Sequence, residues 1–482
     1  MNTALELAST NNFVDYFNTF VNNTNTLLDK ILFFKIYGFP FLILIAILAF
    51  IACNFLFNFV SIRLFKHSID VVRGKYTSLD DPGSITHSQA IFTAALSTVG
   101  LGSVAGVAFA ITIGGPGSIF WIMFAGWLGM SAKFAEVTLG HKYRTFKEDG
   151  LISGGPFLYM RKGMAEVGWK KIGATLGAIY AVTMMLTSFG AANMFQTNQA
   201  ALVISSDFPL LASHPTLITL IIVVPIAIVV LGNAKSIAKL AGSVVPFMTV
   251  FYIVASIIVL TVNYKNLIPS LMLIIKDAFA PQAFVGGVVG SMVAGFSRAV
   301  FATESGGGTA AIAHAPSKTK EPIREGTTVF LEVILALTVC LMTGLVIVAT
   351  NVHQDIDCAK GVLLTKAAFK TVHPYFAVVL TIAVYFLAVT TVMGWGYFGT
   401  MACLYVFGNK GVIFYKIIFL LVAWCGAATG EADHVIKLCD YIWAIVMLPN
   451  LFCVLFMSPM IRNDLKSYVD RYKAGSFKAN FK

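Results

Sequence analysis

Residues 301–309 read Phe-Ala-Thr-Glu-Ser-Gly-Gly-Gly-Thr and interrupt an apolar stretch that extends roughly over residues 283–315. Glycine disfavours helix by about 1 kcal/mol per residue, so three in a row predict that a helix here unwinds locally. An acidic residue, Glu304, stands beside the glycines. The pattern predicts two half-helices joined by a polar break.

A second stretch has the same character. Residues 97–106 read Ser-Thr-Val-Gly-Leu-Gly-Ser-Val-Ala-Gly within apolar residues 84–113. These glycines fit close helix packing as well, because Gly102-x-x-x-Gly106 is a GxxxG pattern. Packing alone does not explain Glu304 or two similar interruptions. Interrupted spans in matching positions of two halves are the best sequence indication of a transporter binding site.

The composition places these helices in a bilayer. Of 482 residues, 57% are hydrophobic and 12% are charged, whereas a soluble domain carries about 25% charged residues. A soluble enzyme and a disordered chain are both excluded. The sequence predicts an all-α polytopic membrane protein, and unwound backbone at membrane depth must then be buried or line a cavity.

Runs of about 20 apolar residues predict eleven transmembrane helices. They lie roughly at 37–62, 84–113, 115–141, 172–203, 215–232, 237–262, 283–315, 326–350, 374–406, 411–428 and 437–459. A shorter segment, 266–280, is predicted to be interfacial or re-entrant. If the first span is an accessory helix, ten remain, and an odd number per half makes the two five-helix repeats inverted in topology.

The predicted domain boundaries follow from these spans. We expect an external segment, an accessory helix with its cytoplasmic loop, two repeats and a basic cytoplasmic tail, at residues 1–36, 37–83, 84–262, 263–460 and 461–482 respectively.

Loop charge predicts the orientation. With the loop after the first span placed inside, 24 of the 34 Lys and Arg residues are cytoplasmic, eight are external, and Lys133 and Arg298 lie within spans. This follows the positive-inside rule. It predicts an external N-terminus and a cytoplasmic C-terminus in the plasma (inner) membrane of a prokaryote. It also accounts for the net charge of +11 without a nucleic-acid partner.

Several motifs resemble the alanine or glycine:cation symporter family, the sodium:alanine symporters of prokaryotes. The resemblance covers roughly residues 37–460. Its most specific pieces are Gly-Leu-Gly-Ser-Val-Ala-Gly-Val-Ala at 100–108, Gly-Gly-Pro-Gly-Ser-Ile-Phe-Trp at 114–121, Gly-Met-Ser-Ala-Lys-Phe-Ala-Glu at 129–136, Gly-Gly-Pro at 154–156, Ile-Ala-His-Ala at 312–315, Gly-Trp at 394–395 and Pro-Asn-Leu at 449–451.

The chain departs from the family pattern close to the breaks. The family usually has Asn where Ser103 stands, and Asn and Ala where Thr303 and Ser305 stand. Thr400 replaces a Glu in the stretch after Gly-Trp. The scaffold therefore matches better than the pocket, which indicates a divergent member.

An amino acid substrate needs partners for both of its charges in hydrocarbon. Half-helix N-termini expose N–H groups, so we assign the carboxylate to Gly100 and Gly102. The ammonium is assigned to carbonyls freed around Gly306, assisted by Thr303. The resemblance implies a pocket glutamine at Gln89, for which a helix–helix hydrogen bond is the alternative. Trp395 is expected to limit side-chain size.

The resemblance to inverted-repeat symporters also implies a sodium site. It would consist of the Leu96 and Val99 carbonyls with the Thr390 and Thr391 hydroxyls. Adjacent threonines can instead bond to their own helix. Because Ser103 replaces an Asn used by a second sodium in some relatives, one co-transported sodium is expected, with no organic cofactor.

Buried charges are predicted to have structural or gating roles. Arg298 is expected to pair with Glu304 or Glu332. Lys133 and Glu136, spaced i, i+3, are expected to pair locally near the cytoplasmic end. His314 is expected to be structural.

The sequence thus favours sodium-coupled import of a small neutral amino acid by alternating access. A proton-coupled amino acid or amine carrier on the same fold is the alternative. A channel is disfavoured because one chain has internal inverted halves, and an enzyme because no polar residues cluster as a catalytic site. The oligomeric state is left open, and a monomer is compatible with the sequence.

Overall fold

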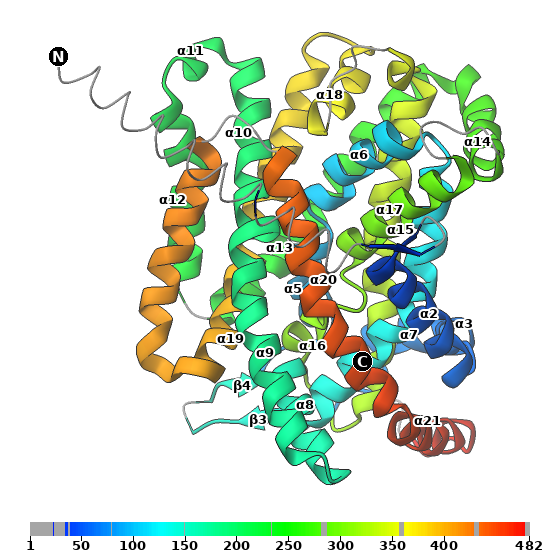
Figure 1. Ribbon diagram of the computed structural model, residues 1–482, viewed down its shortest axis with the longest axis vertical. Helices are drawn as coiled ribbons and strands as arrows, with labels where there is room; N and C mark the ends of the chain where they lie inside the picture. The colour runs from blue at the N-terminus through cyan, green and yellow to red at the C-terminus, as the bar shows by residue number, and fades with distance from the viewer. Residues whose placement is uncertain are drawn as a thin grey trace.

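The computed structural model describes residues 23, 34–36, 39–78, 80–148, 150–232, 234–280, 287–355, 361–428 and 433–477. The predicted external segment 1–36 lies almost entirely outside these residues. The described chain is a bundle of helices, most of which run along the long axis of the molecule (Figure 1). The predicted all-α architecture is confirmed.

The first predicted repeat contains a bent helix followed by long helices. Its elements are α5 (His87–Thr98), η1 (Leu101–Ser103), α6 (Ala105–Gly114), α7 (Ser118–Lys142), β3 (Thr145–Phe146), β4 (Ile152–Ser153), α8 (Pro156–Glu166), α9 (Lys170–Phe189), η2 (Gly190–Met194), α10 (Phe195–Asp207), α11 (Pro209–Ala212), α12 (Pro215–Leu231) and α13 (Ala234–Val262). β3 and β4 form an antiparallel hairpin.

The second predicted repeat has a similar order. Its elements are α14 (Tyr264–Phe279), α15 (Gly287–Thr303), α16 (Thr309–His314), α17 (Pro322–Ala349), η3 (Val352–Gln354), α18 (Val362–Lys370), α19 (Phe376–Ala428) and α20 (Asp433–Phe456). Non-helical Gly408 divides α19 into two parts, which agrees with the two spans predicted there. The predicted tail begins as a further helix, α21 (Ser458–Lys473), bent by 58° from α20.

The accessory helix is shorter than predicted. The chain enters through the two-residue strands β1 (Lys35–Ile36) and β2 (Phe39–Pro40), and α2 (Phe41–Leu56) ends before residue 62. Asn58 and Phe59 then take left-handed conformations, both with φ 51°, which stop the helix. The short helices α3 (Val60–Arg63) and α4 (Phe65–Val72) follow.

Five described helices are long and apolar enough to cross a membrane, or seven when each bent pair is counted as one span. The total of eleven spans stays a prediction. The ends of the bundle match the charge analysis, because α8, the β3–β4 hairpin and α21 lie at one end and α11, α14 and α18 at the other (Figure 1). Which end faces the cytoplasm also stays a prediction.

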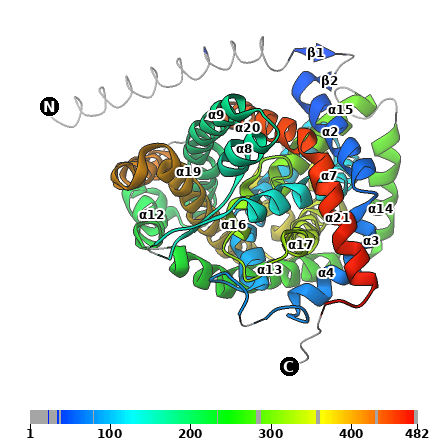
Figure 2. The same ribbon diagram turned by 90° about the horizontal axis from the view of Figure 1, so that it is seen from below.

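Small residues let the central helices approach closely. A Cβ atom on Gly140 of α7 would collide with Ala311 of α16, and one on Gly326 of α17 would collide with Thr138 of α7. Seen from below, α16 and α17 lie inside the bundle, whereas α12 and part of α19 lie at its edge (Figure 2). The accessory helix is fastened to α7 by Asn54, whose Nδ2 donates to the Leu128 carbonyl over 2.8 Å.

Candidate binding site at the two helix breaks

The first break separates α5 from α6 and is bridged by η1. α5 ends at Thr98, and Gly100 is extended, with φ −124° and ψ −160°. Within the described residues, the N–H groups of Gly100 and Leu101 donate to no backbone carbonyl, and the Leu96 and Val99 carbonyls accept no backbone hydrogen bond. The break therefore offers both donors and acceptors in the interior of the bundle.

The second break separates α15 from α16. Glu304, Gly306 and Gly308 all have positive φ, at 53°, 87° and 77°. Glycine adopts this conformation at no steric cost, but a glutamate rarely does. The unwinding predicted from the glycine run is confirmed, and the backbone strain falls on the acidic residue at the break.

The two breaks lie against each other. A Cβ atom on Gly102 would be 2.9 Å from the Phe301 ring. The Ser97 hydroxyl donates to Glu304 Oε2 over 3.0 Å, and the Thr309 hydroxyl donates to the same oxygen. Because Thr309 begins α16, the Glu304 carboxylate also lies at the positive end of that half-helix.

Lys133 is fully buried between the helices and does not pair with Glu136, so that prediction is wrong. Its Nζ lies 2.6 Å from Glu332 Oε1 of α17 and donates to the Thr303 carbonyl over 2.7 Å. The Thr98 hydroxyl donates to the same Glu332 oxygen over 3.3 Å. Lys133 thus stands at the depth of the breaks and joins α7, α15 and α17.

The contacts of Glu332 continue toward the end predicted to be cytoplasmic. Its Oε2 lies 3.6 Å from His314 Nε2, and His314 Nδ1 lies 2.6 Å from Glu325 Oε1. His87 Nδ1 is within hydrogen-bonding distance of Glu325 Oε2. We call Lys133, Glu332, His314, Glu325 and His87 the buried charge network. It joins α5, α7, α16 and α17, all four at buried positions.

Two helices outside this network hold the second break as well. Asn450 of α20 donates from Nδ2 to the Gly306 carbonyl and to Glu136 Oε1, both over 2.8 Å. The Tyr180 hydroxyl of α9 donates to the Gly307 carbonyl over 2.6 Å. The break is therefore held from two sides.

These contacts occupy the groups expected to receive a substrate ammonium. The Thr303 carbonyl accepts from Lys133 and the Gly306 carbonyl from Asn450, while the Thr303 hydroxyl donates to the Ala299 carbonyl over 2.8 Å. In this conformation, these groups of Thr303 and Gly306 form hydrogen bonds with other groups of the protein.

Three of the four residues of the expected sodium site, Leu96, Val99 and Thr391, lie at the first break. The Thr391 hydroxyl of α19 packs directly on Gly100, so closely that a Cβ atom on Gly100 would collide with it. That hydroxyl donates to the Leu387 carbonyl over 2.7 Å, which leaves its lone pairs available. Thr390 is turned elsewhere, because its hydroxyl lies 3.3 Å from the Met248 sulfur of α13.

Trp395 is buried near the second break, with the Trp443 side chain between them. Its ring lies 5.5 Å from that of Trp443, at 69°. The Trp443 ring in turn covers Gly307 closely enough that a Cβ atom there would collide with it. An aromatic wall is therefore present beside the break, with Trp443 as its nearer member.

Gln89 does not lie at the break. It is the third residue of α5, and its side chain accepts from the Thr86 N–H over 2.9 Å while Thr86 Oγ1 accepts from the Gln89 N–H over 3.2 Å. This reciprocal pair is a capping box. The structure thus corrects the placement of Gln89 in the pocket.

Replacing Gln89 by alanine should lower stability and leave substrate binding unchanged, because a cap contributes about 1 kcal/mol to a helix. We expect a melting temperature a few degrees lower and a substrate KM within twofold of that of the unmodified protein. Thermal unfolding and uptake kinetics measure the two effects. A KM raised tenfold or more would mean that Gln89 contributes to substrate binding.

Arg298 was expected to pair with Glu304 or Glu332, and the structure gives both carboxylates other partners, named above. The Arg298 guanidinium lies 5.5 Å from the Phe301 ring centroid. Its Cδ would be 3.7 Å from a Cβ atom on Gly106. Arg298 therefore lies between α15 and α6, on the side of the first break that leads into α6.

Sequence reasoning missed several groups that hold the site, namely Ser97, Tyr180, Glu325, Trp443 and Asn450. Asn450 stands within the Pro-Asn-Leu motif, and Ser97 opens the glycine-rich stretch, so both were visible without an assigned role. Tyr180 and Trp443 have no local pattern that distinguishes them from lipid-facing aromatic residues.

Comparison with known proteins gives consistent matches over the chain. The model of the sodium:alanine symporter family matches residues 19–482. The sodium/alanine symporter AgcS of Methanococcus maripaludis is 36% identical over 418 residues, which are 85% of this chain and 90% of that protein. The probable sodium/glutamine symporter GlnT of Bacillus subtilis is 29% identical over 439 residues, 90% of this chain and 89% of that one.

Two further matches bear on coupling and fold. The putative sodium/proton-dependent alanine carrier protein YrbD of Bacillus subtilis is 28% identical over 444 residues, 88% of each chain. The crystal structure of MhsT in complex with L-phenylalanine has a TM-score of 0.56 at 16% sequence identity, and the match covers 77% of this chain and 89% of that one. This match shows that the two chains share a fold.

Proposed function

Because this chain belongs to the sodium:alanine symporter family, we propose that it is a secondary active transporter that imports a small neutral amino acid, of the alanine or glycine class, together with sodium. The observation that carries the proposal is the meeting of the two helix breaks, where Gly102 packs on Phe301 and Ser97 bonds to Glu304. The cell membrane that holds it is the plasma (inner) membrane of a prokaryote.

The substrate carboxylate is assigned to the first break. The N–H groups around Gly100–Gly102 include donors without a backbone acceptor in the described chain, and such donors suit an anion. The ammonium is directed toward the second break, where the C-terminal end of α15 is the negative end of a helix dipole. The Thr303 and Gly306 carbonyls accept from Lys133 and Asn450 in this conformation, and each oxygen has a second lone pair that can accept the ammonium.

The methyl group of alanine is assigned to the side of the pocket walled by Trp443 and Trp395. Large rigid rings beside the break leave little space for a longer substrate side chain. The names of the relatives agree with this size range in part, since two are named for alanine and one for glutamine.

Sodium is assigned to the Leu96 and Val99 carbonyls with the Thr391 hydroxyl. These oxygens come from α5, the residue that follows it and α19, and oxygen ligands suit a hard cation. Alternating access would be a movement between two groups of helices.

The buried charge network makes α5, α7, α16 and α17 costly to separate, because breaking a buried ion pair leaves an uncompensated charge. These helices would move as one body against α19, and sodium at their boundary would stabilise one of the two arrangements.

Uptake by reconstituted proteoliposomes tests the function. We expect alanine accumulation driven by an inward sodium gradient, little accumulation when potassium replaces sodium, and competition by glycine and serine but not by leucine. Uptake of the same rate and extent without sodium would overturn the coupling. Competition by leucine equal to that by glycine would overturn the size limit.

Proton coupling is the second candidate, and the buried charge network favours it. Ionisable side chains follow one another from His87 to Lys133 and reach the Thr303 carbonyl. Uptake at fixed sodium with an imposed pH gradient separates the two candidates. Accumulation driven by the pH gradient alone would favour protons, and its absence would favour sodium alone.

A further inference from the structure

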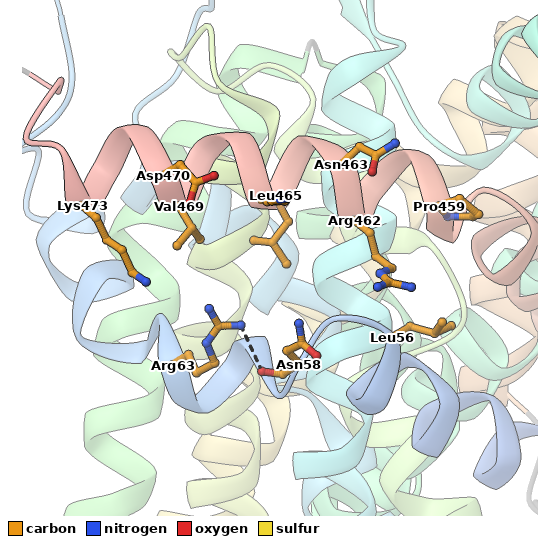
Figure 3. Close-up of a pocket in the computed structure, with 11 residues that line it drawn as sticks. Leu56, Asn58, Arg63, Pro459, Arg462, Asn463, Leu465, Val469, Asp470 and Lys473 are labelled. Carbon is orange, nitrogen blue, oxygen red and sulfur yellow. Dashed lines mark hydrogen bonds between the residues drawn. The ribbon is translucent and has the colours of Figure 1, made fainter.

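A groove of about 430 Å³ lies between α21 and the turn that joins α2 to α3. Four basic side chains line it, from Arg63, Arg462, Lys466 and Lys473. Figure 3 shows Arg63 reaching up from α3 while Arg462 and Lys473 reach down from α21 into the same space. The four side chains are exposed, and they gather positive charge around one open groove.

The positive charge of this cationic groove is not balanced by the protein. Asp470 is the acidic side chain in its lining, so four cations against one carboxylate leave an excess of three charges. Nearby acids are engaged elsewhere, since Asp464 pairs with Lys142 and Glu321 pairs with Arg471. In the described part of the chain, none of the four groove cations forms an ion pair.

Both walls of the cationic groove are held in place. α21 is tied to α4 by the Tyr468 hydroxyl, 2.7 Å from His67 Nε2. Burial, with Arg324 nearby, lowers the pKa of His67 to about 4, so this ring is neutral at pH 7. The opposite wall contains the left-handed Asn58 and Phe59, and Arg63 Nη1 donates to the Asn58 carbonyl over 3.5 Å. Backbone strain of this kind persists where the surroundings fix it, and it concentrates at functional sites.

A second groove, of about 860 Å³, lies between α2, α9 and α20 and has an entirely apolar lining. It adjoins the cationic groove at two places, on α2 and at the junction of α20 and α21. On α2, Ala52 lines the apolar groove and Leu56 the cationic one; along α20 and α21, Leu455 and Pro459 do the same. Ala52 and Leu56 are about one helical turn apart, and Leu455 and Pro459 flank the bend between α20 and α21, so the two grooves are neighbours.

We propose that the two grooves together bind one anionic phospholipid, with its phosphate diester in the cationic groove and an acyl chain in the apolar groove. Arginine and lysine donors match phosphate oxygens, and basic pockets at the cytoplasmic side of membrane helices suit anionic headgroups. The grooves lie at the end of the bundle that the loop charge places in the cytoplasm, so the lipid comes from the inner leaflet. A zwitterionic headgroup would add a cation to a groove that already has an excess.

Native mass spectrometry of the purified full chain tests the site, using phosphatidylglycerol and phosphatidylcholine with identical acyl chains. We expect phosphatidylglycerol to be retained at least tenfold more than phosphatidylcholine. The variant Arg63→Gln/Arg462→Gln/Lys466→Gln should lose this preference. Its matched control, Arg161→Gln/Lys162→Gln/Lys320→Gln, removes the same charge from exposed positions outside the groove and should keep it.

Two further arms distinguish a lipid from a free anion and guard against misfolding. Ala52→Phe fills the apolar groove and should weaken phosphatidylglycerol binding at least fivefold with all groove charges intact. Millimolar inorganic phosphate should not displace the lipid. Equal preference for phosphatidylglycerol in the groove variant and its control would overturn the proposal, as would displacement by phosphate. Melting curves of each variant establish that a loss of lipid occurs in folded protein.

Discussion

Replacing Lys133 by methionine should reduce sodium-driven uptake at least 100-fold. Methionine has a similar length but no charge, so Glu332 would stay buried without its cation and the Thr303 carbonyl would lose its donor. Breaking a buried ion pair by removing one partner costs about 3–5 kcal/mol. Part of that cost falls directly on the second break, which has to keep its shape for substrate to bind.

The double variant Lys133→Met/Glu332→Gln separates stability from transport. Removing both charges leaves no unpaired ion, and neutral replacements of buried pairs are often well tolerated. We expect its melting temperature to return close to that of the unmodified protein while uptake stays low, since the Thr303 carbonyl still lacks a donor. If the single variant transports within twofold of the unmodified protein, Lys133 does not position the break.

Much of the fold follows from the sequence because hydropathy and glycine content act locally. The breaks at Gly100 and at Gly306–Gly308 unwind where glycine and polar side chains replace aliphatic ones. The end of the accessory helix was less visible. Asn58 is compatible with a left-handed helix end, but Phe59 is not a residue type that signals one, and both have φ 51° after α2 ends.

Partner choice among buried charges could not be predicted in the same way. Lys133 and Glu136 have the spacing of a helical ion pair, but Glu332, 199 residues away, is the actual partner. That contact exists because α7 and α17 pack closely through glycines such as Gly326, a tertiary fact that spacing along one helix does not contain. Glu304 and Glu332, the carboxylates expected near Arg298, likewise contact side chains of other helices, Ser97 of α5 and Lys133 of α7.

Gln89 is a different kind of error, because the sequence contained the correct signal. Thr86-His87-Ser88-Gln89 fits the capping-box pattern that opens a helix. The predicted span began at residue 84, which made Gln89 look like a polar residue inside the membrane. A boundary set by the cap at Thr86 would have placed Gln89 in the first turn of α5.

Replacing Thr391 by alanine should raise the half-saturating sodium concentration at least tenfold and leave uptake at saturating sodium within twofold. The Thr391 hydroxyl lies on Gly100, beside the Leu96 and Val99 carbonyls that accept no backbone bond in the described chain. A contact to a charged group contributes about 1.5–3 kcal/mol, which corresponds to a 10- to 100-fold change in affinity. Alanine uptake measured across a sodium titration gives the value.

The neighbouring residue supplies the control. Thr390 has the same chemistry one position away, but its hydroxyl donates to the Phe386 carbonyl over 2.7 Å and faces Met248. Thr390→Ala should therefore leave sodium affinity within twofold, and Thr391→Ser, which keeps the hydroxyl, should do the same. Equal losses in the two alanine variants would mean that this part of α19 acts through packing. A loss confined to Thr391→Ala would place sodium between α5 and α19, where its binding couples the two parts of the transporter.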